Sequence, residues 1–258
     1  MGRIDRTGKE NVNNFGSKMI ISKYNNNRDM DVYFPAYNWT AKNVAYDAFK
    51  KGNIRCPYER RVHGKGYIGI GEYSSKENDK ITKCYTTWQN MLQRCYDDDF
   101  KKREPTYQGC EVCTEWHDFQ VFAHWYNDNY YQIEDEVMNL DKDILVKGNK
   151  IYSPETCVFV SKNINSLFVK RNKSRGDLPI GVYYNKQKGK YMSRCSFGYG
   201  ENIYLGVYST KEEAFRVYKQ YKEKIIKEVI DSYEGKIPEP HYSRLRDAMY
   251  NYEVEIDD

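Results

Sequence analysis

The sequence lacks the segments that membrane-spanning and secreted proteins need. No apolar run approaches the roughly 18 residues of a transmembrane helix, and no apolar signal segment follows Met1. A strong excess of charge is also missing, because 41 Lys and Arg oppose 37 Asp and Glu for a net charge of +4. We therefore expect a soluble protein that is neither secreted nor bound to a membrane.

The seven cysteines do not form the pattern of a disulfide framework or of a zinc finger. Without a secretory signal, reduced thiols are expected. Only Cys110 and Cys113 have the close spacing of zinc ligands, and no second such pair follows them. The favoured interpretation is that the cysteines are small buried apolar residues. A structural Zn²⁺ site made of Cys110, Cys113 and Cys157 is the alternative.

Aromatic residues are abundant, at 16% of the chain, and 26 residues are Tyr. Disordered chains are poor in aromatic residues, so this one has the material for a folded core. Its 258 residues are enough for two ordinary domains or three small ones. The local patterns predict a multidomain α+β protein, which we divide into the four regions 1–75, 76–172, 173–235 and 236–258.

Region 1–75 should form a small β-rich module. Residues 20–21 and 32–34 are β-rich runs, and the Asn- and Asp-rich residues 25–29 between them indicate a turn. We expect these strands to close into a small β-barrel-like module that serves as an accessory DNA- or protein-binding element. Four glycines within residues 64–71 predict a hinge after it.

Region 76–172 begins with helical periodicity. Apolar residues at positions 88, 91, 92 and 95 lie on one face of a helix that should end near Tyr96, and the same spacing predicts a second helix through Trp116, Phe119, Phe122 and Trp125. The remaining pattern is strand, turn, strand and helix. It places strands at 140–145 and 157–160 and the helix from 162 to about 168.

Region 173–235 combines basic charge with alternating strands, at residues 181–184, 190–195 and 202–206. A helix should follow, because Thr210 with Glu213 three residues later forms a capping box. The basic residues that precede or lie on these strands include Lys173, Arg175, Lys186, Lys188, Lys190 and Arg194. Region 236–258 should contain one more helix, at 242–250, and an acidic tail.

Four short motifs occur in order in the third region: Gly181-Val182-Tyr183, Lys190-Tyr191-Met192, Tyr204-Leu205-Gly206 and Thr210-Lys211-Glu212-Glu213-Ala214. Over about 50 residues, this series resembles the AP2 (ethylene-response-factor-like) DNA-binding domain. That family lays a three-stranded sheet on duplex DNA and reads the major groove with strand side chains. The resemblance implies that Lys186, Lys188, Lys190 and Arg194 contact DNA, in keeping with the release of counterions by clustered Lys and Arg. Lys173 and Arg175, which precede the motifs in the same basic stretch, are further DNA-binding candidates. A solvated charged face is the alternative.

The second region carries a longer series of motifs. It begins with Trp88-x-x-Met91-x-x-Arg94-Cys95-Tyr96 and Gly109-Cys110-x-Val112-Cys113, and continues with Leu140-Asp141-Lys142-Asp143, Tyr152-Ser153-Pro154-Glu155-Thr156-Cys157 and Asn163-Ile164-Asn165. This order resembles the HNH endonuclease-like proteins of bacteriophages, many of which carry an AP2 domain downstream. The resemblance implies a phage-encoded DNA endonuclease that acts in the bacterial host cytoplasm.

HNH endonucleases hold one divalent metal in a strand–loop–strand–helix segment. The resemblance places Asp141 and Asn165 at the two metal-binding positions, with Mg²⁺ or Mn²⁺ as the cation. Two positions depart from the family pattern, because Lys142 stands where the catalytic histidine belongs and Thr156 where the central asparagine belongs. A lysine with a pKa near 10.4 is a poor general base unless it is strongly desolvated.

The departure at Lys142 leaves two hypotheses open. In the first, the protein cleaves or nicks double-stranded DNA, and either His117 or His124 supplies the base or Asp143 orients a water on the metal. In the second, Lys142 contacts phosphate in an inactive fold. The protein would then be a DNA- or protein-binding regulator, or an inhibitor of a host defence system. The expected partner is double-stranded DNA, or a host defence protein in the second case, and no oligomeric state is predicted.

Overall fold

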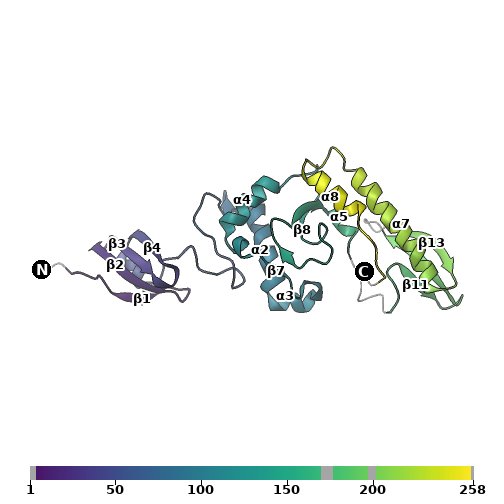
Figure 1. The fold of residues 1–258 in the computed structure, drawn as a ribbon. Coiled ribbons are helices and arrows are strands. Elements are labelled where there is room, and N and C mark those ends of the chain that lie inside the picture. The colour runs from purple at the N-terminus through teal and green to yellow at the C-terminus, as the bar shows by residue number, and fades with distance from the viewer. Residues whose placement is uncertain (1–3, 170–176, 197–201, 257–258) are drawn as a thin grey trace. The chain divides into compact units, whose positions relative to one another are not determined.

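The computed structural model describes residues 4–169, 177–196 and 202–256 (Figure 1). The chain divides into two compact units, Met1–His124 and Trp125–Asp258. The division falls inside helix α4 (Phe119–Asn129). Helices alternate with several small sheets along both units, which confirms the expected α+β class.

The first unit begins with an antiparallel sheet in the order β1-β2-β3-β4 (Figure 1). Its strands are β1 (Glu10–Val12), β2 (Lys18–Asn26), β3 (Asp29–Phe34) and β4 (Trp39–Val44). Because β1 and β4 are both edge strands, this sheet is open and the expected β-barrel-like closure is wrong. The apolar face is covered instead by helix α1 (Tyr46–Lys50) and the segment after it, which contribute Phe49, Ile54 and Cys56 to the core.

Residues 64–71, where a hinge was expected, pack against the helical part of the first unit. A Cβ atom on Gly66 would lie 2.7 Å from the Trp88 ring, so only glycine allows this close approach. Gln120 also fastens the segment, since its Nε2 donates to the carbonyl oxygens of Ile68 and Tyr73 at 3.1 and 3.0 Å. The glycines therefore allow close packing of this segment.

The helical part of the first unit contains the hairpin β5 (Lys76–Glu77) and β6 (Lys80–Ile81), then α2 (Lys83–Tyr96), α3 (Asp98–Arg103) and β7 (Glu111–Val112). Helix α2 ends at Tyr96 as predicted and buries the four expected side chains. The second predicted helix is shorter than expected. Trp116 belongs to a separate 3₁₀ turn (Thr114–His117), because Asp118 is extended and breaks the helical path before α4. The other 3₁₀ turns are Pro35–Tyr37 and Pro105–Tyr107.

After the end of α4, the second unit contains a strand–loop–strand–helix segment. It is formed by β8 (Met138–Asp141), β10 (Val158–Ser161) and α5 (Lys162–Ser166), with β9 (Ile151–Tyr152) inside the loop. Its apolar residues form one core with the last half of helix α7 (Lys211–Asp231) and with α8 (His241–Tyr250). The order of these elements agrees with the sequence pattern.

Strands β11 (Val182–Asn185), β12 (Lys190–Ser196) and β13 (Asn202–Tyr208) form a three-stranded antiparallel sheet in this order. Helix α7 packs on one face of this sheet and begins with the predicted capping box of Thr210 and Glu213. Tyr218, in the first half of α7, lies in the core under the sheet, whereas Ile226 and Ile230 belong to the other core. A single helix therefore connects the sheet to the strand–loop–strand–helix segment.

Candidate functional site

The strand–loop–strand–helix segment places Asp141 where the chain leaves the sheet. Strands β8 and β10 are antiparallel, and Asp141 pairs with Val158 at the loop end of the ladder. At the other end Ser161 caps helix α5, its Oγ accepting a hydrogen bond from the backbone N–H of Ile164 at 3.2 Å. The loop that separates the two strands thus begins and ends beside Asp141.

Asp141 organises the first turn of this loop. Its Oδ1 accepts hydrogen bonds from the backbone N–H groups of Asp143 and Ile144, both at 2.8 Å. Burial and, after it, the negative charge of Asp143 raise the pKa of Asp141 to about 6. A carboxyl group with a second acidic side chain beside it forms a setting that a hard divalent cation would neutralise.

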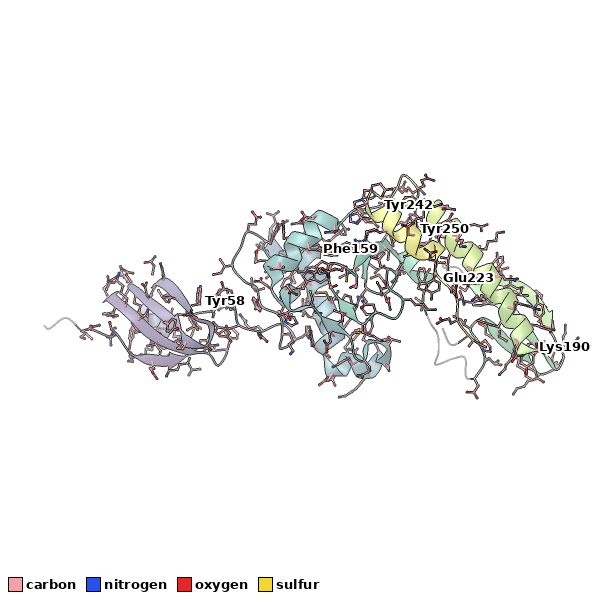
Figure 2. All side chains as sticks on the ribbon, viewed as in Figure 1. Tyr58, Phe159, Lys190, Glu223, Tyr242 and Tyr250 are labelled. Carbon is pink, nitrogen blue, oxygen red and sulfur yellow. The ribbon has the colours of Figure 1, made fainter. Side chains whose placement is uncertain are left out.

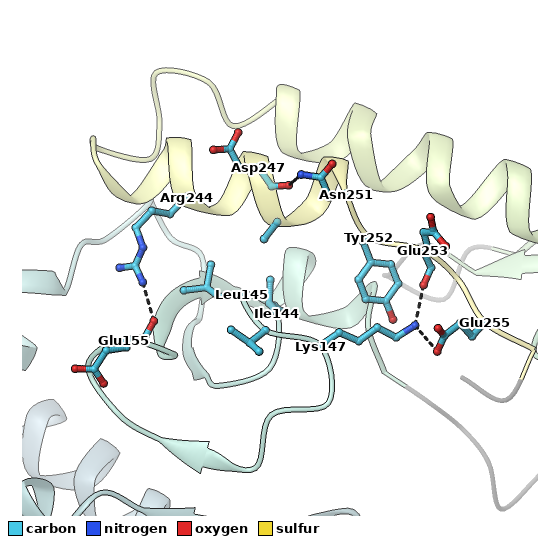
Figure 3. Close-up of a pocket in the computed structure, with 12 residues that line it drawn as sticks. Ile144, Leu145, Lys147, Glu155, Arg244, Asp247, Asn251, Tyr252, Glu253 and Glu255 are labelled. Atoms are coloured by element: carbon cyan, nitrogen blue, oxygen red, sulfur yellow. Dashed lines mark hydrogen bonds and ion pairs between the residues drawn. The ribbon is translucent and has the colours of Figure 1, made fainter.

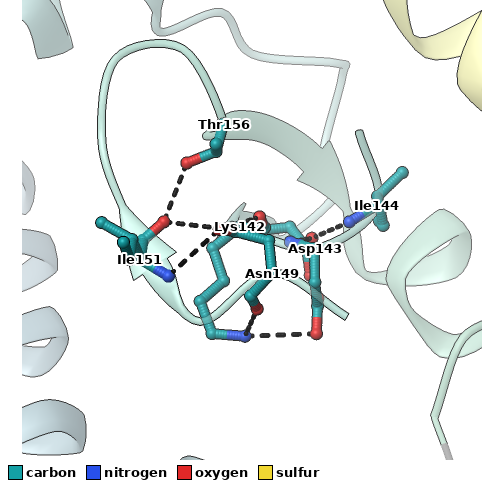
Figure 4. Close-up of polar contacts among 7 residues, drawn as sticks. Lys142, Asp143, Ile144, Asn149, Ile151 and Thr156 are labelled. Carbon is teal, nitrogen blue, oxygen red and sulfur yellow. Dashed lines mark hydrogen bonds and ion pairs between the residues drawn. The ribbon is translucent and has the colours of Figure 1, made fainter. Parts of the chain in front are cut away.

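Lys142 is buried, and its ammonium group is held inside the loop (Figure 4). The Nζ atom donates to Oδ2 of Asp143 at 3.1 Å and to the carbonyl oxygen of Asn149 at 3.2 Å. It also lies 5.8 Å from the centroid of the Tyr152 ring. An ammonium group has donors and no acceptor, so in this arrangement Lys142 cannot take a proton from water. Its role in this geometry is to tie Asp143 to the loop.

Asn149 braces the loop from the inside (Figure 4). Its Nδ2 donates to the carbonyl oxygens of Lys142 and Ile151, both at 2.7 Å, and its Oδ1 accepts from the N–H of Ile151 at 3.2 Å. Thr156 supports the same point, because its Oγ1 donates to the Ile151 carbonyl at 2.8 Å. Asn149 is not among the site residues predicted from the sequence, in which Thr156 takes the position of the central asparagine. The available signal was an asparagine in the Gly148-Asn149 turn.

Asn165 lies on α5, in the same unit as Asp141. The residue before it on this helix, Ile164, is fully buried. The two candidate histidines are engaged within the first unit. His117 is buried with its Nε2 3.1 Å from the Tyr96 hydroxyl, and burial lowers the pKa of its imidazole. His124 has its Nδ1 3.2 Å from the Tyr73 hydroxyl.

Among the residues that the structure describes, no group of three or more His, Cys, Asp or Glu side chains is placed to hold a metal ion. The three cysteines considered for zinc are buried at positions 110 and 157 and partly buried at 113. Asp141 and Asn165 offer a different chemistry. Carboxylate and amide oxygens are ligand types that suit Mg²⁺ and Mn²⁺, so each of these two residues fits such a cation chemically.

A groove of about 620 Å³ lies beside the loop, between residues 144–147 and helix α8 (Figure 3). Lys147 crosses one end of it, where its Nζ donates to the Glu253 carbonyl at 2.8 Å and pairs with the Glu255 carboxylate at 3.0 Å. Arg244 of α8 donates to the Glu155 carbonyl at 2.9 Å. These contacts attach the loop that follows Asp141 to α8 and to the C-terminal segment.

The second candidate surface is the face of the three-stranded sheet that points away from α7, called here the outer sheet face. Val182, Ser193 and Cys195 are buried against the helix side, so the alternate positions point outward. The outer sheet face consists of Tyr183, Lys190, Met192, Arg194, Tyr204 and Val207. Tyr183 is 52% exposed and Tyr204 57%, and the three strands contain no Asp or Glu.

The structure gathers most of the predicted DNA-binding residues on or beside this face. Lys190 and Arg194 lie on β12 and are exposed, with Lys190 at the end of the sheet (Figure 2). Lys186 and Lys188 are exposed in the turn before β12, which the side chain of Asn185 holds by accepting from the N–H of Lys188 at 3.2 Å. Lys173 and Arg175 lie outside the described residues. The exposed Tyr183 and Tyr204 were missed, although strand alternation could have placed them opposite the buried positions.

Comparisons of the chain with family models, with curated proteins and with solved structures found no match. None of the described helices has both the length and the apolar character needed to cross a membrane.

Proposed function

We propose that this protein binds double-stranded DNA through its outer sheet face and that the strand–loop–strand–helix segment cleaves or nicks the bound DNA with a divalent metal. The observation that carries the proposal is the outer sheet face itself, which presents Arg194 and Lys190 beside exposed tyrosines and without an acidic residue on its strands. The AP2-like and HNH-like motifs extend this proposal to a phage-encoded endonuclease in the bacterial host cytoplasm.

The physics of duplex DNA supports this use of the sheet. The major groove admits a narrow antiparallel β-ribbon, and side chains on its outward face then reach base edges. Lys186, Lys188 and Lys190 surround one end of the sheet, where phosphates on either side of a groove would lie. Arg194 is in the middle of β12 and suits a guanine, because its guanidinium can donate two parallel hydrogen bonds.

Asp141 and Asn165 would hold the Mg²⁺ or Mn²⁺ ion that the cleavage proposal requires. A bound cation supplies Lewis-acid polarisation of the scissile phosphate and of a water nucleophile. The chain contributes a loop whose shape is fixed by Asn149 and by the two hydrogen bonds to Asp141. Asp143, about half exposed, is the carboxylate within this loop that would orient water.

A second candidate function is DNA binding without cleavage. The observation that favours it is the hydrogen bonding of Lys142, which donates to Asp143 and to the Asn149 carbonyl and so offers no proton acceptor at the position of the general base. In this case the protein would act as a regulator, or as an inhibitor of a host defence system.

The binding proposal is tested by replacing Lys186, Lys188, Lys190 and Arg194 with Ala and measuring affinity for duplex DNA across a range of salt concentrations. Each lost phosphate contact removes about 0.9 from the slope of log affinity against log salt, so the slope should flatten by up to about 3–4. The matched control replaces four basic residues of α7, Lys211, Arg216, Lys219 and Lys224, with the same change in charge. If the slope flattens equally in both variants, the outer sheet face is not the DNA contact.

The cleavage proposal is tested with the Asp141→Asn variant and supercoiled DNA in Mg²⁺ or Mn²⁺. Asparagine keeps an oxygen that can accept from the N–H groups of Asp143 and Ile144, so the loop should persist while the negative charge is lost. We expect metal-dependent nicking in the wild type and none in the variant. Equal nicking by both proteins would assign the activity to another site. Tight binding without nicking by the wild type would favour the second candidate function.

A further inference from the structure

The proposed function leaves one positively charged region of the chain, residues 1–66, without a role. Residues 1–66 contain 13 Lys and Arg and six Asp and Glu, a net charge of +7, whereas the whole chain carries only +4. This region comprises the open sheet β1–β4 and the segment that covers its apolar face (Figure 1). Its charge needs an explanation other than the packing of that sheet.

Two arginines of this region are arranged around one exposed aromatic ring. Phe15, in the turn between β1 and β2, is 44% exposed. The guanidinium carbon of Arg61 lies 3.5 Å from the centroid of its ring, and that of Arg55 lies 5.7 Å away. Both arginines are exposed, so the stacking on Phe15 positions them without burying their donors. We call this group the Phe15–arginine cluster.

A buried polar pair holds the cluster in shape. Asn13 is 4% exposed, and its Oδ1 accepts from the N–H groups of Phe15 and Ser17 at 3.0 and 2.8 Å, which fixes the turn. Its Nδ2 donates to the Ile54 carbonyl at 3.0 Å and to Oε1 of Glu59 at 2.5 Å. These bonds fasten the turn that carries Phe15 to the segment that carries Arg55 and Arg61. That segment is anchored in turn by Tyr58, which packs against the core of the sheet (Figure 2).

The two guanidinium groups have no carboxylate partner among the described residues. The ion pairs of this sheet lie elsewhere, between Lys18 and Glu10 and between Lys51 and Asp47. An arginine fork is a rigid, multiple donor that suits the oxygens of a phosphate. Two such forks held beside an exposed ring on a net positive module therefore form an anion-binding surface that is organised before it meets its ligand.

We propose that the Phe15–arginine cluster is a second nucleic-acid contact, which binds the phosphodiester backbone of duplex DNA. The choice of DNA over another polyanion rests on the proposed function of the outer sheet face. The charge complementarity is independent of that proposed function, because the net charge of +7 on residues 1–66 attracts the regular negative charge of a phosphate backbone. The cluster would add affinity and salt dependence without sequence preference, because backbone contacts carry no direct base information.

The test uses the full chain and a labelled duplex of mixed sequence. Arg55→Gln with Arg61→Gln removes both forks and keeps polar side chains of similar length. Arg28→Gln with Lys42→Gln is the matched control. Arg28 is exposed in the turn between β2 and β3, Lys42 is exposed on β4, and the change in net charge is identical. Loss of two phosphate contacts should flatten the slope of log affinity against log salt by about 1.8. When salt is raised from about 50 to about 200 mM, the affinity of the wild type should therefore fall by a factor about 12 times larger than that of the variant.

A third variant, Arg55→Lys with Arg61→Lys, separates charge from geometry. We expect it to keep most of the salt slope and still to bind more weakly than the wild type, because lysine lacks the planar fork. Thermal unfolding of each variant verifies that the sheet remains folded.

Three results would overturn the proposal. One is a slope that changes equally in the Arg55/Arg61 variant and in the Arg28/Lys42 control, since the effect would then be general charge. Another is a salt slope that is unchanged in the Arg55/Arg61 variant but is flattened when the four basic residues at the outer sheet face are replaced. That result would leave the proposed function standing and would assign the cluster to a different anion, such as an acidic protein. If the wild type fails to bind the duplex even at low salt, the cluster and the outer sheet face both lose their assigned partner.

Discussion

Removing the side-chain amide of Asn149 should destabilise the second unit by about 2–4 kcal/mol. The amide makes three hydrogen bonds, to the carbonyl of Lys142 and to both backbone groups of Ile151. Lys142 is buried, so its carbonyl loses a partner that water replaces poorly, at a cost of about 1–3 kcal/mol. Ile151 is 47% exposed, and each bond to it should contribute only about 0.5 kcal/mol.

The assay is urea unfolding of the Asn149→Ala variant followed by circular dichroism. Because the chain forms two compact units, two transitions are expected, and only the one that belongs to Trp125–Asp258 should move. Asn251→Ala is the matched control, since its Nδ2 makes one bond, to the Asp247 carbonyl at the exposed end of α8. Its effect should stay below about 1 kcal/mol.

The substitution Asn149→Asp sharpens the same test. Aspartate keeps the acceptor for the Ile151 N–H but places a carboxylate oxygen against two carbonyl oxygens, so it should destabilise at least as much as alanine. If Asn149→Ala changes the unfolding free energy by no more than the Asn251 control does, the asparagine does not brace the loop and the reasoning fails.

Two further predictions concern the packing of a glycine and the titration of a partly buried histidine. Gly66→Ala should lower the stability of the first unit by about 1–3 kcal/mol, because the new Cβ would crowd the Trp88 ring, and an unchanged first transition in urea would contradict that packing. Burial and, after it, the positive charge of Arg244 hold the pKa of His241 below its ordinary 6.5, and the negative charge of Glu239 only partly offsets them. The folded state therefore binds fewer protons than the unfolded state as pH falls below 6.5, so stability should decline there. His241→Phe should keep the stacking on Tyr131 and reduce that decline in thermal melts, and an identical pH profile would refute the assignment.

Features that depend on neighbouring residues could be predicted from the sequence. The apolar spacing of α2 and its end at Tyr96 follow from helix geometry, and the capping box of α7 involves residues only three apart. The break before α4 could not be predicted in this way. Trp116 fits the apolar spacing of the predicted helix, but an extended Asp118 separates it from α4.

Features that depend on distant contacts were missed. The closure of β1–β4 was predicted wrongly because the same strands can form a barrel or an open sheet, and the choice was decided by Phe49 and Ile54, which cover the apolar face from outside the strands. The brace at Asn149 was missed for a similar reason. Its partners are Lys142, seven residues earlier, and Ile151, so its role depends on the path of the whole loop.

Helix α7 connects the two parts of the proposed function within the second unit. Its buried stripe is Ala214, Tyr218, Lys222, Ile226 and Ile230, with a lysine where the two cores meet. Lys222 satisfies part of its hydrogen bonding through the Ser196 carbonyl at 3.2 Å, and burial holds its pKa below the ordinary value. Because one continuous helix is packed on both cores, DNA held on the outer sheet face would lie at a fixed position relative to Asp141. Target choice by the sheet would then determine where the metal-dependent loop meets the backbone.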